Sequence, residues 1–283
     1  MEWKLVARPG VSALERFLTD HEPHGVVVSE KVRTGYLDKR LRTGGRCYYA
    51  PGEAVVYHGP GGFFSPLGVS AIPHAPRRQA LLAELQRAMG TFSRLYSIMG
   101  PQDDVEALEP AFRATPTHTI DYDLLALDWA HFPSQERPPH PELRYFIPEP
   151  PQWRRLLSLQ TAYEVEEVLL PGRRPNLAAS RATILHSLEH QVVLVATYQD
   201  TVVARVATNA RGYQGDQVGG VYTDPQWRNR GVARWLMTVL LAHLQNEKRN
   251  ASLFVKLDNR PAQELYRSLG FLFESPFRIS YYR

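Results

Sequence analysis

Two stretches in the second half of the chain combine residue types that can bind an anion and move a proton. The first, at 217–233, runs from an apolar segment through a polar turn into Arg228-x-x-Gly231-x-Ala233, and a helical pattern follows directly. The loop amides and the first unpaired N–H groups of that helix point the same way, and the helix dipole favours negative charge there. Gly231 lets a ligand approach the backbone, while Arg228 and Arg230 add mobile positive charge. This stretch therefore predicts an anion site, although an ordinary strand–turn–helix without a ligand has the same pattern.

The second stretch, at 259–271, reads NRPAQELYRSLGF. Together the two stretches resemble the two signatures of the Gcn5-related N-acetyltransferases, the GNAT family. These are Arg/Gln-x-x-Gly-x-Gly/Ala in the pyrophosphate-binding loop, and Asn-x-x-Ala-x-x-Leu-Tyr followed by Gly-Phe. The strand end Val-Tyr-Thr-Asp-Pro at 221–225 also fits the family pattern, and the resemblance covers residues 143–283.

The resemblance implies an α/β domain of the GNAT fold, whose mixed, mostly antiparallel sheet is flanked by helices and splays open between strands at 217–223 and 251–255. Acyl-coenzyme A, most simply acetyl-CoA, would enter this opening. Its pyrophosphate would lie on the amides of 228–233 and its amide-rich arm along the free edge of the first of these strands. The cofactor-binding residues implied are Val221, Tyr222, Thr223, Arg228, Asn229, Arg230, Gly231, Val232, Ala233, Asn259, Ala262 and Tyr266. No metal is expected, because the sequence has no HExxH, no CxxC and no Cys/His cluster.

Direct acyl transfer needs a neutral amine, stabilisation of the carbonyl oxygen as charge develops, and a proton for the departing thiolate. The resemblance places Tyr266 at the family's proton-donor position, and the alternative for this residue is packing of a helix-face aromatic on the sheet. Asn259 would hydrogen-bond the cofactor arm, and it can also cap the following helix. The oxyanion donor would be a backbone N–H at Val221 or Tyr222. Gly219 and Gly220 would keep the strand edge open or form a bulge.

The general base is less well defined, because the strand at 217–223 contains no carboxylate. The candidates are Glu166 and Glu167 near the end of a predicted helix, with Glu164 and Asp216 as neighbours. Solvated helix charges are the alternative interpretation of these carboxylates. Side chains that would pair with the cofactor's ribose phosphate, or simply lie on the surface, are Arg234, Lys256, Arg260 and Arg267.

The chain as a whole has 283 residues, a formal charge of +4 and a sequence pI of about 9.2. This excess is too small and too dispersed to predict nucleic-acid binding. No apolar run approaches the ~18–20 residues that cross a bilayer, and the N-terminus lacks the apolar core of a signal peptide. The only cysteine, Cys47, cannot form an internal disulfide, so a reducing cytoplasm is the expected location. A monomer or a homodimer is expected.

Seven prolines within 131–151 indicate a domain boundary, because proline disfavours both helix and central strand. We predict a linker at 131–142 between a first domain, 1–130, and an acetyltransferase domain, 143–283. The turn Ile98-x-Gly100-Pro101 resembles one in the first half of certain two-domain bacterial acetyltransferases, in which that half is a degenerate copy of the fold. The first domain here lacks the Arg-x-x-Gly-x-Gly/Ala signature. We therefore expect it to be structural or to shape the substrate cleft.

The leading hypothesis is an acyl-CoA-dependent N-acyltransferase that transfers its acyl group directly to a primary amine of a small molecule or a protein. The alternative is a sensor or scaffold that binds acyl-CoA without turnover, which the missing strand carboxylate keeps open. The retained Tyr266 favours the enzyme.

Apolar periodicity predicts the elements that position these residues. Helices are expected at 11–21, within 26–41, and at 77–89, 102–113, 152–169, 177–189, 232–248 and 261–268. Strands are expected at 46–50, 54–57, 63–72, 95–98, 143–147, 192–198, 202–208, 217–223, 252–255, 272–274 and 278–282, with tight turns at 59–62 and 199–200.

Overall fold

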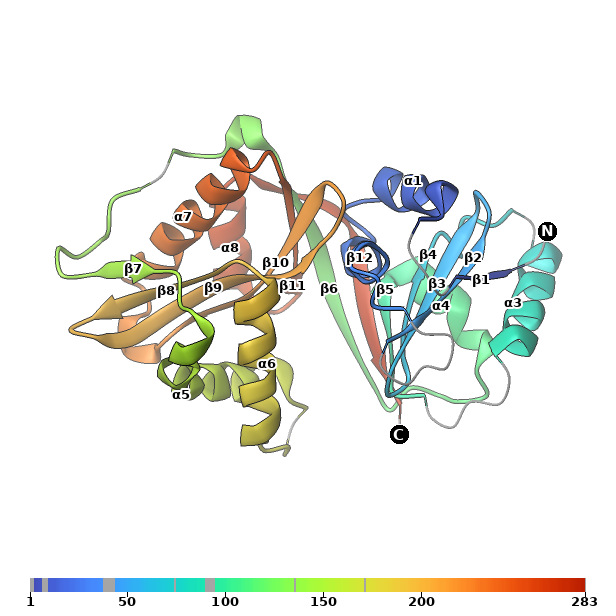
Figure 1. The fold of residues 1–283 in the computed structure, drawn as a ribbon, viewed down its shortest axis with the longest axis horizontal. Coiled ribbons are helices and arrows are strands. Elements are labelled where there is room, and N and C mark those ends of the chain that lie inside the picture. The colour runs from blue at the N-terminus through green and yellow to red at the C-terminus, as the bar shows by residue number, and fades with distance from the viewer. Residues whose placement is uncertain are drawn as a thin grey trace.

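The computed structural model describes residues 3–6, 10–37, 44–73, 75–89, 95–134, 136–170 and 172–282. Its strands form one mixed sheet with the order β1-β2-β3-β4-β5-β12-β6-β11-β10-β9-β8-β7 (Figure 1). The strands are β1 Lys4–Val6, β2 Arg46–Ala50, β3 Ala54–Gly59, β4 Phe63–Leu67, β5 Ser97–Pro101, β6 His118–Leu127, β7 Arg144–Phe146, β8 Val193–Tyr198, β9 Thr201–Arg211, β10 Gly215–Thr223, β11 Asn250–Lys256 and β12 Phe271–Tyr281. The helices are α1 Ser12–Asp20, α2 Val26–Arg33, α3 Ala75–Met89, α4 Gln102–Leu108, α5 Trp153–Tyr163, α6 Leu177–His190, α7 Val232–Asn246 and α8 Arg260–Ser268.

The two halves of the chain have the same order of elements. Each half runs strand, helix, helix, three strands, helix, strand, helix, strand, so that β1–β6 correspond in order to β7–β12. The sheet order is unchanged when the halves are exchanged and the sheet is read from its other edge. At the centre β6 and β12 pair with each other, and each also pairs with a strand of the opposite half, β6 with β11 and β12 with β5. Strand pairing therefore crosses between the halves in the middle of the molecule.

The sequence interpretation missed the central strand β6 and the short edge strand β1. The signal for β6 is present at 119–127, where Ile120, Tyr122 and Leu124 alternate with two aspartates before an apolar end. This strand belongs to the predicted first domain, 1–130, yet it lies between β11 and β12. The predicted boundary at 131–142 therefore does not separate two independent sheets, and the division into domains stays a prediction.

Several predicted elements end earlier than expected. The strand expected at 63–72 ends at Leu67, because the next residue, Gly68, has a φ of +78° and turns the chain. The helices expected within 26–41 and at 102–113 end at Arg33 and Leu108. Residues 38–41 lie outside the described residues.

The element that follows α5 also differs from the prediction. The helix expected at 152–169 is α-helical to Tyr163 and then continues as a π-helical turn, Glu164–Val168. The wider turn changes which way the glutamates point, a feature that helical periodicity does not predict. The last two predicted strands are one strand, β12, with a bulge between Phe273 and Ser275. The tight turn at 199–200 is confirmed, and both of its residues have positive φ.

Helices cover both faces of the strands in the second half, with α7 and α8 on one side and α5 and α6 on the other (Figure 1). Val193 and Val195 of β8 pack against Leu156 of α5 and Ile184 of α6. Leu194, between them in the sequence, lies in the core formed with α7. This alternation follows from the two-residue period of a strand, and it holds β8, β9 and β10 firmly between two helical layers.

The parallel strands β10 and β11 stay paired only at their beginnings. Residues 215–217 pair with 250–252, and no later pair joins the two strands among the described residues. On its other side β10 remains paired with β9, with an irregularity between Gly219 and Tyr222. Gly220, inside this bulge, has a φ of +61°, which glycine adopts without strain. The strands therefore part after residue 217, and the opening expected from the sequence is confirmed.

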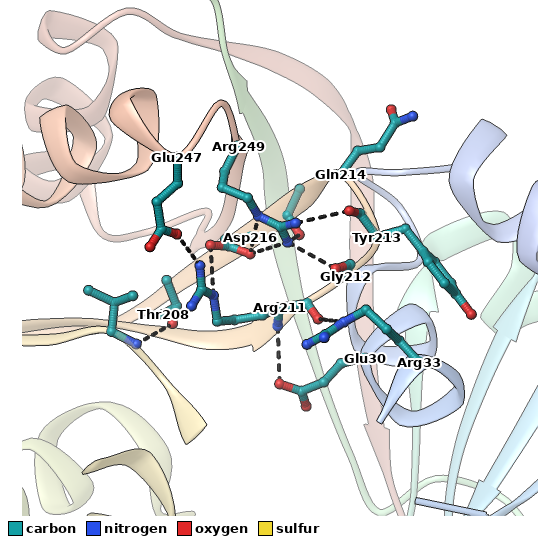
Figure 2. Close-up of polar contacts among 12 residues, drawn as sticks. Glu30, Arg33, Thr208, Arg211, Gly212, Tyr213, Gln214, Asp216, Glu247 and Arg249 are labelled. Carbon is teal, nitrogen blue, oxygen red and sulfur yellow. Dashed lines mark hydrogen bonds and ion pairs between the residues drawn. The ribbon is translucent and has the colours of Figure 1, made fainter. Parts of the chain in front are cut away.

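A cluster of charged side chains joins the tip of the β9–β10 hairpin to the first half (Figure 2). Asp216 is fully buried, and its carboxylate pairs with Arg211 at 3.0 Å and with Arg249 at 2.6 Å. Arg211 also pairs with Glu247, and its backbone N–H donates to Glu30 of α2 at 3.1 Å. The base of β10 is thereby fixed by charges from both halves of the chain.

Candidate active site

A cavity of about 310 Å³ lies in the gap between β10 and β11. A second cavity, of about 500 Å³, adjoins it and extends to the start of α7. The two share Glu167, Val221, Asn259, Ala262 and Leu265 in their walls. Together they form a groove that runs from the loop at 228–233 to the middle of the sheet, a shape suited to a long ligand.

The groove brings together residues that are distant in the sequence. All the cofactor-binding residues expected from the resemblance line one or both cavities, except Arg230. The Arg230 guanidinium lies over the ring of Trp227, 5.2 Å from its centroid. Its neighbour Arg228 lines the groove instead.

The loop before α7 has the backbone geometry of an anion site. Gly231 precedes the helix with a φ of +75°, and Asn229 also has positive φ, 58°. The helical hydrogen bonds begin with the N–H of Trp235, which donates to the Gly231 carbonyl at 3.0 Å. The N–H groups before it have no intrahelical partner. A Cβ on Gly231 would meet only Pro139, at 3.6 Å, so the approach to these amides is open.

The side chain of Arg228 bridges this loop and the π-helical turn. Its Nη2 donates to the Glu166 carboxylate at 2.7 Å, and its Nε donates to the Thr223 carbonyl at 3.1 Å. The Tyr222 hydroxyl donates to the same Glu166 carboxylate at 2.9 Å. The hydrogen bond from Arg228 holds the pKa of Glu166 below its ordinary value. Glu166 is therefore a weak base that faces the anion site rather than the gap in the sheet.

Glu167, the next residue, occupies a different position. It lines the cavity between β10 and β11 together with Tyr266. Its carboxylate pairs with Lys256 at 3.0 Å and accepts a hydrogen bond from the Asn259 side chain at 3.4 Å. The Asn259 side-chain oxygen accepts the N–H of Ala262 at 3.2 Å, so Asn259 caps α8 as expected and also positions Glu167.

Tyr266 is part of both the cavity wall and the hydrophobic core. It is 8% exposed, and its ring meets Phe271 edge-on with 5.9 Å between centroids. Burial raises the pKa of its hydroxyl, and the nearby Tyr163 and Glu167 raise it further. The phenol therefore stays protonated at neutral pH and retains a proton that it can donate. Tyr266 therefore packs in the core and also lines the cavity, and its role as proton donor stays a prediction.

The other candidate bases have structural partners. Asp216 is enclosed by Arg211 and Arg249, as described above. Glu164 accepts hydrogen bonds from Gln160 at 2.7 Å and from Ser180 at 2.5 Å, which tie α5 to α6. Of the four carboxylates considered from the sequence, only Glu167 lines the cavity in the gap.

Two of the basic residues considered for a ribose phosphate are also engaged. Arg234 pairs with Glu136 at 2.7 Å, and this contact holds the segment before β7 on α7. Lys256 pairs with Glu167.

Sequence reasoning missed several aromatic residues of the cavity. Tyr163 comes from the end of α5, Tyr122 from β6, Phe254 from β11 and Tyr281 from β12. The rings of Tyr122 and Phe254 meet edge-on with 5.1 Å between centroids. Strands from both halves supply this wall, so no local motif marks it.

The described part of the chain shows no group of three or more acidic, histidine or cysteine side chains that could hold a metal ion. None of its described helices is long and apolar enough to cross a membrane.

Comparison with known proteins agrees with this geometry. The acetyltransferase (GNAT) family matches residues 153–271. A mycothiol acetyltransferase from Thermobifida fusca (strain YX) is 46% identical over 66 residues, which are 22% of this chain and only 20% of that protein.

Solved structures resemble the chain over nearly its whole length. A GNAT-family acetyltransferase from Colwellia psychrerythraea has a TM-score of 0.57 at 10% identity, covering 99% of this chain and 100% of that one. A Gcn5-related N-acetyltransferase-like protein from Streptococcus suis has a TM-score of 0.55 at 13% identity, covering 97% and 100%. A Gcn5-related N-acetyltransferase from Sphaerobacter thermophilus has a TM-score of 0.55 at 17% identity, covering 97% and 94%. These likenesses show a shared fold. The family match covers residues 153–271, the part of the chain in which the parted strands and the loop before α7 also lie.

Proposed function

We propose that this protein transfers an acyl group, most simply acetyl, from coenzyme A to a primary amine of a small molecule or a protein. One observation carries the proposal. The gap between β10 and β11 joins an open helix-start anion site at 228–233 to a cavity wall that holds both Tyr266 and Glu167. A pyrophosphate would lie on the amides before Trp235, with Arg228 beside it. The amide-rich arm would lie along the edge of β10 that β11 leaves free.

Glu167 is the proposed base and Tyr266 the proposed acid. The amine nitrogen bonds to the acyl carbon and loses a proton to Glu167, directly or through water, while the carbon–sulfur bond breaks. Tyr266 gives its proton to the departing sulfur, and both groups exchange protons with solvent afterwards. Glu167 is preferred over Glu166 because Glu167 lines the cavity between β10 and β11, whereas Glu166 pairs with Arg228 outside that cavity.

The first half of the chain is proposed to be a degenerate copy of the same fold. The repeated element order supports this, and so does the loop after β4, which corresponds in order to the anion loop after β10. That loop already holds an internal anion. The buried Asp104 of α4 accepts the N–H groups of Gly68 at 2.8 Å and Ser70 at 2.7 Å.

The corresponding strands of the first half also leave no opening. A Cβ on Gly100 of β5 would lie only 2.9 Å from the Pro66 carbonyl of β4. The first half is therefore expected to bind no coenzyme A of its own. Its strand β6 pairs with β12 of the second half, and the two strands supply Tyr122 and Tyr281 to the cavity wall. The first half is thereby proposed to have a structural role at this wall, the acceptor side of the cavity.

Isothermal titration calorimetry and a thiol-release assay on the full chain test these proposals. Calorimetry is expected to show one coenzyme A per chain. With acetyl-CoA and a panel of amines, the protein is expected to release free thiol, which is measured as the coloured product of a thiol reagent. Binding without thiol release for any amine would favour the alternative, a protein that senses or carries acyl-CoA. Two sites per chain would refute the degenerate first half.

The cellular location and the oligomeric state of the protein are proposals as well. The single cysteine, Cys47, is buried and unpaired, and a reducing cytoplasm is the location proposed for it. A monomer or homodimer without a nucleic-acid partner is proposed from the modest net charge.

A further inference from the structure

Behind the bulge of β10 lies a buried arginine that makes no ion pair among the described residues. Arg205 of β9 is 5% exposed; one of its terminal nitrogens donates to Gln160 of α5, and its Nε has no hydrogen-bond partner. A Cβ on Gly220 would lie 3.0 Å from Arg205 Nη2, so the guanidinium lies directly against the bulge. The Gln160 side chain bonds both Arg205 and Glu164, and Glu164 also attracts the guanidinium through space. Burying a cation without a contacting anion costs free energy, and this cation lies where β10 borders the cavity.

Tyr163 lines the cavity and lies within electrostatic reach of this cation. It is the last residue of α5, and the π-helical turn begins directly after it. Its ring lines the cavity and meets the ring of Tyr222 edge-on, with 6.0 Å between centroids. The backbone N–H of Gly220 faces its hydroxyl and acts to lower the pKa of that group. A phenol oxygen that faces an N–H still has its own O–H to donate.

We infer that Tyr163 donates the hydrogen bond that stabilises the acyl carbonyl oxygen during transfer, with Arg205 and the Gly220 N–H strengthening this donor from behind. The inference rests on the proposed acyl transfer and adds a catalytic side chain to it. The expected backbone donor at Val221 or Tyr222 stays a prediction, and Tyr163 of α5 would supply a second donor beside it. No bond to Tyr163 forms or breaks, and its proton remains on the phenol.

The electrostatics of the site support this role. Burial raises the pKa of Tyr163, while Arg205 acts in the opposite direction. The phenol therefore stays protonated and remains a donor at neutral pH. A fixed positive charge behind a donor, in a site shielded from water, stabilises an oxygen that becomes negative more than it stabilises a neutral carbonyl. This preference for the developing charge is what lowers the barrier.

Substitution of Tyr163 separates catalysis from packing. Tyr163→Phe keeps the ring contact with Tyr222 and removes only the hydroxyl. Its kcat for thiol release is expected to fall about 100-fold, the effect of losing one oxyanion donor, with the Kd for coenzyme A and the KM for the amine within twofold of wild type. Tyr145→Phe, on exposed β7, is the matched control and should not change kcat. An unchanged kcat in Tyr163→Phe, or a loss that appears only in Kd, would overturn the inference.

The contribution of the positive charge of Arg205 to kcat can be tested separately. Arg205→Gln removes the cation, and kcat is expected to fall by a factor similar to that in Tyr163→Phe. Arg205→Lys keeps a cation and is expected to recover part of the loss. A double variant, Tyr163→Phe with Arg205→Gln, should lose little more than either single variant, because the two act as one unit. Fully additive losses would refute the coupling.

A spectroscopic measurement reports the hydrogen bond to the acyl carbonyl directly. Infrared difference spectra of [1-¹³C]acetyl-CoA bound to the wild-type chain should show the carbonyl band at lower frequency than in free acetyl-CoA, because a strong hydrogen bond weakens the C=O bond. The shift should be lost in Tyr163→Phe. A band at the free position in wild type, or the same shift in both proteins, would refute the inference. A shifted band in a wild-type protein that releases no thiol would instead refute the proposed function while leaving the hydrogen bond intact.

Discussion

Arg228 Nη2 and the Glu166 carboxylate meet at 2.7 Å across the cofactor groove. The residue best placed to pair with a pyrophosphate is thus already paired with an internal anion. Both partners are more than one-third exposed, at 38% and 43%, so the pair contributes little to stability, ~1 kcal/mol or less. Its main consequence is competition, because a bound pyrophosphate must share Arg228 with Glu166 or displace it.

Glu166→Gln is therefore expected to bind coenzyme A more tightly than wild type. Removal of the competing charge should lower Kd about two- to fivefold, measured by calorimetry. Glu189→Gln, a neutralisation on α6 away from the groove, is the control and should leave Kd unchanged. Weaker binding by Glu166→Gln would show that Glu166 positions Arg228 rather than competing for it.

The same competition has a pH dependence. Because the folded-state pKa of Glu166 lies below its ordinary value of 4.5, the carboxylate is charged above that value and loses its charge as pH falls through the lowered pKa. The difference in Kd between wild type and Glu166→Gln should therefore be constant above about pH 5 and shrink on acidification below it. A difference that grows on acidification would contradict this assignment.

Two arginines close together in the loop are expected to behave differently. Arg228→Gln should raise the Kd for coenzyme A roughly 10- to 100-fold, because a charge-assisted hydrogen bond to phosphate is lost. Arg230→Gln should stay within about twofold, since that guanidinium lies over Trp227 outside the groove lining. Because both variants remove one charge, equal weakening would indicate a general electrostatic effect instead.

Glu167→Gln tests the base. Its kcat should fall roughly 100-fold or more, while the Kd for coenzyme A changes little. Glu166→Gln should keep most of its kcat, because Glu166 lines the neighbouring cavity and not the gap between the strands. An unchanged kcat in Glu167→Gln would mean that another group, or water alone, takes the proton.

Tyr266→Phe tests the acid. The variant keeps the edge-on contact with Phe271 and loses only the hydroxyl, so folding and coenzyme A binding should be retained. Its kcat should fall roughly 100-fold when the acyl donor has a weakly acidic thiol, because such a thiolate is a poor leaving group. An acyl donor with a more acidic thiol should recover much of the rate, because its sulfur needs less protonation. Full activity in Tyr266→Phe would exclude the proton-donor role.

The buried Asp216 is expected to matter for stability (Figure 2). Asp216→Asn leaves Arg211 and Arg249 without their shared anion, which should cost about 3–5 kcal/mol. The Tm measured by calorimetry should fall by roughly 5–15 °C. Glu247→Gln, on the exposed rim of the same cluster, should cost about 1 kcal/mol or less. Equal effects of the two substitutions would mean that burial does not set the contribution of this cluster.

Local sequence determined the cofactor side of the site. The glycine and the helix start that shape the loop at 228–233 are neighbours in the chain, as are the helix cap Asn259 and the following Tyr266. Their geometry depends on short-range backbone rules, so the motif could be recognised from local sequence, and the parted strands were implied by the family resemblance that the motif carries. The direction of each side chain could not be predicted in this way. The Arg230 side chain, for example, lies over Trp227 and outside the groove lining.

Only the tertiary structure shows which residues form the aromatic wall of the cavity, and which of the two adjacent glutamates lines it. In the π-helical turn after α5, Glu166 meets Arg228 and Glu167 lines the cavity, and these partners come from segments distant in the sequence. The wall with Tyr122 and Tyr281 forms because β6 and β12 pair across the two halves. Such contacts join residues more than a hundred positions apart, and their energy comes from long-range packing that no short window of sequence records.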